Sequence, residues 1–152
     1  MAIPNPIHDP QSVVLRIDGA CRGNGRPNAR ASYGVYLGHN SRYNMNGLLP
    51  LSLPQTSMQA EIEALHHALD VLHNIAKDDF VLSEFTIASD CESLVLSMSE
   101  RMEGWIEKGG YNNQGKQVVH FERLKQLHDR LEEMEYGDDG AYMSSCGIFG
   151  AS

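Results

Sequence analysis

The chain has 152 residues, enough for one domain with a hydrophobic core, and its composition is globular, with 41% hydrophobic and 21% charged residues. The net charge of −8 excludes a protein whose whole surface attracts nucleic acid, but not one that binds nucleic acid through carboxylate-held metal ions. No apolar run is long enough to span a membrane, and no secretory signal is visible at the N-terminus. The three cysteines follow no metal-binding spacing, so we expect an intracellular protein of the nucleus or cytoplasm, without an obligate protein partner.

The first third of the chain predicts strands. Residues 1–11 contain three prolines and are expected to form a flexible leader. Residues 13–17 are mostly apolar and β-branched, which predicts a first strand, and residues 33–37 and 43–49 predict two more. The segments between them are rich in Gly, Asn and Ser, which favours antiparallel hairpins.

The rest of the chain predicts mainly helices. Thr56 and Gln59 fit a capping box, and a helical repeat of apolar residues follows: Ile62, Leu65, Leu69, Leu72 and Ile75. Residues 85–89 predict a fourth strand, residues 91–107 one or two short helices, and residues 121–134 another amphipathic helix. Residues 137–152 show neither pattern and are expected to be an irregular tail.

This order of elements predicts an α/β fold. We expect a mixed sheet, with three antiparallel strands followed by a parallel strand, flanked by helices and incomplete at its C-terminal part. The domain is expected to span residues 12–136.

Three acidic residues stand out by their positions. Asp18 and Asp90 follow two predicted strands, and their carboxylates would emerge at one end of the sheet if these strands are parallel neighbours. Glu61 is predicted to share the sheet-facing side of its helix with Ala64, Leu65 and Ala68. Carboxylates gathered in this way stay ionised only beside cations, and oxygen ligands suit Mg²⁺ or Mn²⁺. Taken singly, each acid has a structural alternative, because an Asp after a strand often begins a turn or caps a helix.

Four stretches of the sequence carry a resemblance to a known family. These are "IDGACRGNG" at residues 17–25, "QTSMQAEIEAL" at 55–65, "IASDCESL" at 87–94 and "GWIEKGGYNNQGKQVVHFERLKQL" at 104–127. In this order the chain resembles the type 1 ribonuclease H family, especially its eukaryotic members. The resemblance implies a five-stranded mixed sheet and an endonuclease that hydrolyses the RNA strand of RNA/DNA hybrids.

The resemblance also implies roles for particular residues. Asp18, Glu61 and Asp90 match three of the four metal-binding carboxylates of the family, which would hold Mg²⁺ (Mn²⁺ is possible), with two ions in a complete site. Gly19, Asn24, Ser57 and Gln59 are candidates for contact with the hybrid, and Asn24 lies in the turn that approaches the 2′-hydroxyls in the family. Arg22, Arg26 and Arg30 surround the same turn and are either phosphate contacts or solvated loop charges.

The chain also departs from the family pattern. Ser57, Met58 and Gln59 replace the polar residues and the arginine that usually precede the glutamate, and residues 104–116 carry few lysines. The usual last strand, His-bearing loop and Asp-bearing helix are not recognisable after Leu131. The alternative hypothesis is therefore a truncated, catalytically impaired relative with at most weak nucleic-acid binding.

Overall fold

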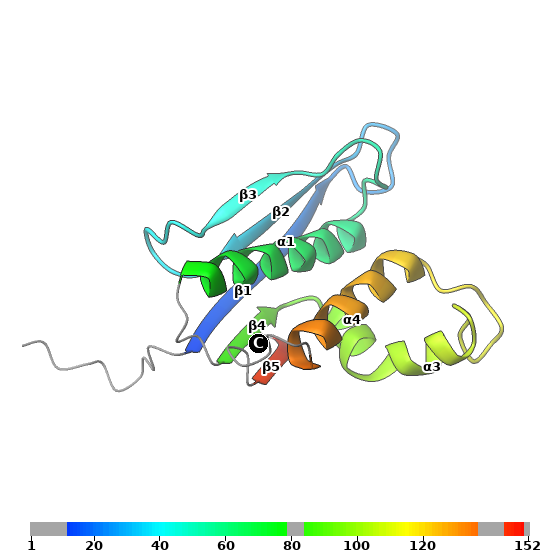
Figure 1. Cartoon of the computed structure of the whole chain (residues 1–152). Helices are drawn as coiled ribbons and strands as arrows, with labels where there is room; N and C mark the ends of the chain where they lie inside the picture. Colours follow the sequence, from blue (N-terminus) through cyan, green and yellow to red (C-terminus); the bar gives the residue numbers. More distant parts are fainter. Residues whose placement is uncertain (1–11, 79–83, 137–144, 151–152) are drawn as a thin grey trace, which may run out of the picture.

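The computed structural model describes residues 12–78, 84–136 and 145–150 (Figure 1). One five-stranded sheet has the strand order β3-β2-β1-β4-β5, with α1 running across it and α4 beside α1. The elements are β1 (Ser12–Arg22), β2 (Arg30–Tyr36), β3 (Met45–Leu48), α1 (Ser57–Asp78), β4 (Glu84–Ser89), α2 (Glu92–Leu96), a π-helical segment (Ser97–Arg101), α3 (Met102–Glu107), α4 (Phe121–Tyr136) and β5 (Ser145–Gly150). The expected leader lies outside the described residues. Within them, no helix is long and apolar enough to cross a membrane.

The predicted mixed sheet is confirmed. β1 pairs antiparallel with β2, β2 antiparallel with β3, and β1 parallel with β4. The first strand was predicted too short, because β1 continues past Asp18 to Arg22. Glycine and polar residues after Ile17 look like a turn in the sequence, but their backbone pairs with β2 as far as Arg22↔Arg30. Asp18 therefore lies inside a strand.

The expectation of an incomplete C-terminal part was wrong for one strand. Ser145–Gly150 forms β5, which pairs in parallel with β4 from Glu84↔Ser145 to Ser89↔Gly150. The free edge of β4 supplies the hydrogen-bonding partner that this glycine-containing segment needs. Residues 137–144 and 151–152 of the expected irregular tail, including Asp138 and Asp139, lie outside the described residues.

The predicted apolar faces of α1 and α4 form the core. The apolar repeat of α1 is buried against the sheet residues Leu15, Ile17, Val35, Phe85 and Ile87, and α4 adds Leu124 and Leu127. α1 begins where predicted, and the Thr56 hydroxyl accepts a hydrogen bond from the backbone N–H of Gln59 at 3.1 Å. Only this half of the predicted capping box is present, because the Gln59 side chain donates to Glu63. This packing fixes which face of α1 meets the sheet, and therefore where Glu61 lies.

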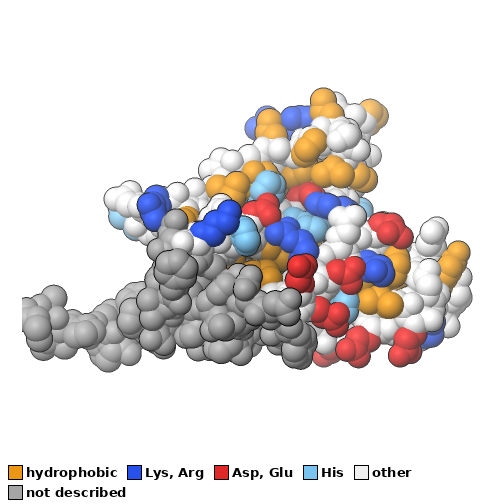
Figure 2. All heavy atoms as spheres, viewed as in Figure 1, with side chains coloured by type: hydrophobic (Ala, Val, Ile, Leu, Met, Phe, Trp, Pro, Cys, Tyr) orange, Lys and Arg blue, Asp and Glu red, His pale blue; other side chains and the backbone are white. Residues whose placement is uncertain are grey.

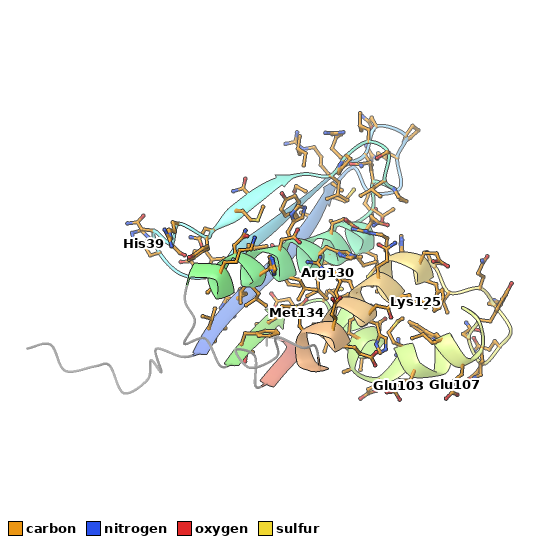
Figure 3. All side chains as sticks on the ribbon, viewed as in Figure 1. His39, Glu103, Glu107, Lys125, Arg130 and Met134 are labelled. Atoms are coloured by element: carbon orange, nitrogen blue, oxygen red, sulfur yellow. The ribbon has the colours of Figure 1, made fainter. Side chains whose placement is uncertain are left out.

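A polar seam between α1 and α4 was not predicted. Glu63 is buried on α1 and accepts hydrogen bonds from the Arg123 guanidinium of α4, one of them 2.9 Å long, and from the Gln59 side chain at 2.8 Å. Seven residues further along α4, Arg130 reaches α1 (Figure 3), where its guanidinium donates a hydrogen bond to Asp70 at 2.7 Å. Two arginine–carboxylate pairs with the same spacing thus join the helices.

We expect Arg123→Met to lower the free energy of unfolding by about 2 kcal/mol, because the buried Glu63 carboxylate would lose its guanidinium partner. This value is below that of a fully buried pair, since a third of the Arg123 side chain is exposed. Urea denaturation measures the change. The matched control is Lys125→Met, which breaks the exposed pair with Asp129 and should cost less than about 0.5 kcal/mol. Equal losses in the two variants would contradict this account of the seam.

Candidate active site

Asp18 and Asp90 lie side by side at the carboxyl end of β4, where the pairing of β1 with β4 ends. The last pair between the parallel strands β1 and β4 is Ile17↔Ser89, and each acid is the next residue in the chain. The prediction that these two strands are parallel neighbours is therefore confirmed. Both acids are exposed, and both line an open pocket of about 520 Å³ together with residues of β2 and β3.

Gly19 brings Glu61 to this end of the sheet. A Cβ atom on Gly19 would lie 2.4 Å from the backbone nitrogen of Glu61 and 2.5 Å from the carbonyl carbon of Ala60. Only glycine permits so close an approach of β1 to the first turns of α1. Gly19 also lies beyond the last pair between β1 and β4, and its N–H donates to the Glu61 carboxylate.

The surroundings of the Glu61 carboxyl group destabilise its ionised form. Its pKa is raised to about 7, chiefly by burial and also by the negative charges of Asp18 and Asp90, while the hydrogen bond from Gly19 opposes the shift. Its Oε2 atom is buried without a hydrogen-bond partner among the described residues. A buried acceptor without a donor is costly, and a bound cation would satisfy it.

The raised pKa predicts how stability depends on pH. Between about pH 4.5 and pH 7 the folded protein holds a proton on Glu61 that the unfolded chain releases, so stability falls as pH rises through this range. Because the carboxyl group is partly exposed, we expect a loss on the order of 1 kcal/mol in metal-free protein. Urea denaturation in EDTA at the two ends of this range measures it.

The matched control for this pH effect is Glu61→Gln, which keeps the shape of the side chain and removes its titration. The difference in stability between the two proteins should change with pH by the amount given above. A pH-independent difference would show that the Glu61 pKa is not raised.

The backbone determines where the two aspartates lie, but no described contact holds their side chains in one orientation. Within the described residues, neither side chain makes a hydrogen bond or ion pair, and no group of three His, Cys, Asp or Glu side chains is arranged to hold a metal ion as it stands. The helix-cap alternative for Asp90 is wrong, because Cys91 is the N-cap of α2 and its N–H bonds to the Ser89 hydroxyl at 3.0 Å. Two exposed, unpartnered carboxylates can rotate toward a cation at little cost in free energy.

The other predicted site residues lie in different environments. Asn24 is exposed in the turn between β1 and β2, and Ser57 is exposed as the first residue of α1. Gln59 is only 2% exposed, and its amide donates to Glu63, so it faces the interior rather than solvent. Gly19 has no side chain, and its position allows the backbone of β1 to pack closely against α1.

Sequence reasoning missed Glu63 and Arg123 as supports of this region. Gln59 and Glu63 flank Glu61 on α1, and Arg123 fixes them from α4. The available signal was a matching spacing of opposite charges. Two acids, Glu63 and Asp70, and two arginines, Arg123 and Arg130, have the same seven-residue separation on their helices. It becomes informative only once the two helices are known to lie side by side.

Comparisons with known proteins decide the family. The RNase H family model matches residues 10–136. The chain belongs to the RNase H family. The predicted resemblance to type 1 members is confirmed by similarity to Ribonuclease H1 of Mus musculus, 30% identical over 82% of this chain, and of Rattus norvegicus, 31% identical over 82%. The chain spans 41% of the length of these relatives.

Solved structures of RNase H domains share the fold. The solution structure of the PFV RNase H domain has a TM-score of 0.62 at 19% identity, covering 92% of this chain and 78% of that one. LC11-RNase H1, solved in complex with an RNA/DNA hybrid, has a TM-score of 0.58 at 21% identity, covering 90% of this chain and 82% of that one.

Proposed function

We propose that this chain is a metal-dependent endonuclease that hydrolyses the RNA strand of RNA/DNA hybrids. Membership of the RNase H family supports the reaction class, and the hybrid bound by LC11-RNase H1 supports the substrate. The observation that carries the proposal is the buried Glu61 Oε2, which has no partner in the described structure and feels the charges of Asp18 and Asp90.

The donor set fits a hard divalent cation. Asp18, Glu61 and Asp90 would hold Mg²⁺ or Mn²⁺ through carboxylate oxygens, and the metal would activate water and stabilise the leaving oxygen of the phosphodiester. The residues of the chain prepare the site. Gly19 N–H holds the Glu61 carboxylate in place, and the exposed aspartates open onto the pocket where substrate would approach.

A cleavage assay tests this function. The purified chain is incubated with a labelled RNA/DNA hybrid and Mg²⁺, and with the matching RNA duplex and DNA duplex. We expect cuts in the RNA strand of the hybrid alone, and their loss in EDTA. A folded chain that leaves the hybrid intact at every Mg²⁺ or Mn²⁺ concentration would refute the proposal.

A second candidate function is weak nucleic-acid binding without cleavage. One observation favours it: within the described residues, no group of three or more His, Cys, Asp and Glu side chains is arranged to hold a metal ion. Hybrid binding by a chain that cuts nothing in the assay above would support this candidate.

A further inference from the structure

Positive and negative charge are separated along this chain. Residues 19–60 contain four arginines and no aspartate or glutamate, a net charge of +4. Since the whole chain carries −8, the remaining residues together carry −12. The acid-free segment includes β2, β3 and the end of β1, so this part of the sheet, the sheet side, carries only positive charges. The helices α1, α2, α3 and α4, the helical side, together carry more acids than bases.

The cations of α4 are neutralised by neighbouring acids. Arg123 pairs with Glu63, Lys125 with Asp129 and Arg130 with Asp70. Glu103 and Glu107 project from α3 near this helix (Figure 3), and Asp and Glu atoms gather over this part of the surface (Figure 2). A polyanion would therefore find little attraction on the α3–α4 side.

The turn between β1 and β2 is different. Within the described residues, the side chains of Arg22, Arg26 and Arg30 make no ion pair or hydrogen bond, and Arg22 and Arg26 are exposed. Asn24 and Asn28 are exposed between them. In Figure 2 the part of the surface around this turn, at the top, shows Lys and Arg atoms without Asp or Glu atoms.

We propose that Arg22, Arg26 and Arg30 form the main phosphate-contact surface of this chain. The chain then binds the nucleic-acid backbone on the sheet side only. This inference rests on the proposed function. Arg22 ends the strand that carries Asp18, about 13 Å along β1 from it, so a duplex at the carboxylates would reach the turn. Guanidinium groups form paired hydrogen bonds with phosphate, and each contact releases counterions. Unpaired arginines can do this without first breaking an ion pair.

Binding measurements on two matched variants, each with four substitutions, test the proposal. Both variants carry Asp18→Asn, which prevents turnover, and fluorescence anisotropy with a labelled RNA/DNA hybrid in Mg²⁺ gives the affinity at several salt concentrations. The test variant adds Arg22→Gln, Arg26→Gln and Arg30→Gln. The control adds Arg42→Gln, Lys108→Gln and Lys116→Gln, which remove the same charge elsewhere. Arg42 lies between β2 and β3, the turn that His39 marks in Figure 3, at the opposite end of the sheet.

Relative to Asp18→Asn alone, we expect the test variant to bind the hybrid roughly tenfold or more weakly at moderate salt. The slope of log K against log salt should become shallower by about two to three. The control should change its affinity by less than about twofold. Thermal unfolding of the test variant should match that of Asp18→Asn alone, because the turn arginines have no partners in the described structure.

Two results would overturn the proposal. If the unsubstituted chain cleaves the hybrid but the two variants bind equally, or the control binds more weakly, the phosphate surface lies elsewhere while the proposed function stands. If the unsubstituted chain neither cleaves nor binds the hybrid, both the surface and the function are refuted.

Discussion

Replacing Asp18 with asparagine is expected to reduce hybrid cleavage by about 10³-fold or more, because a metal ligand loses its charge. The same change should not destabilise the fold. Asp18 is exposed, makes no hydrogen bond within the described residues, and repels Glu61. Initial cleavage rates at saturating Mg²⁺ measure the first effect, and urea denaturation measures the second.

The matched control for this variant is Asp129→Asn. It removes another exposed aspartate from α4, where the carboxylate pairs only with Lys125 in the described structure. We expect its cleavage rate to stay within about twofold of the unsubstituted chain and its stability within about 0.5 kcal/mol. Similar rates for Asp18→Asn and Asp129→Asn would exclude Asp18 from the reaction.

Gly19→Ala is expected to damage the site and the fold together. The added methyl group would lie within 2.5 Å of two backbone atoms of α1, so the strand and helix must move apart. Overpacking of this kind costs about 1–3 kcal/mol. Because Glu61 would move with the helix, we also expect the cleavage rate to fall by roughly 100-fold.

Gly104→Ala is the matched control for the glycine change. Gly104 lies in α3 with no atom within 4 Å of the position that its Cβ would take. Alanine in a helix is more favourable than glycine by up to about 1 kcal/mol, so the control should be as stable as the unsubstituted chain or more so. If Gly19→Ala behaved in the same way, the close approach of β1 to α1 would be wrong.

The prediction of the sheet and of α1 from sequence was possible because these signals are local. A cap at Thr56, a helical apolar repeat and short apolar strands each depend on a few neighbouring residues. β5 was missed because its sequence, "SCGIFG", has little strand character of its own. Its strand conformation depends on pairing with β4, which is distant in sequence.

The candidate site was predictable only in part, for the same reason. The positions of Asp18 and Asp90 followed from the strand pattern, although β1 extends further than its apolar run. The contact between Gly19 and the backbone of Glu61 depends on how closely the strand and helix pack. Gln59 was expected to contact substrate, but its side-chain amide donates a hydrogen bond to the neighbouring Glu63 in the interior. Local sequence does not show which of two nearby partners a side chain will choose.

The most direct test of a cation site at Asp18, Glu61 and Asp90 is the NMR titration of the Glu61 side-chain carboxyl carbon with and without Mg²⁺. Without metal we predict a pKa of about 7, raised by burial and by the two aspartates. A bound divalent cation favours the ionised form, so Mg²⁺ should lower this pKa by at least about one unit. Superimposable titration curves in the two conditions would contradict the metal site on which the proposed function depends.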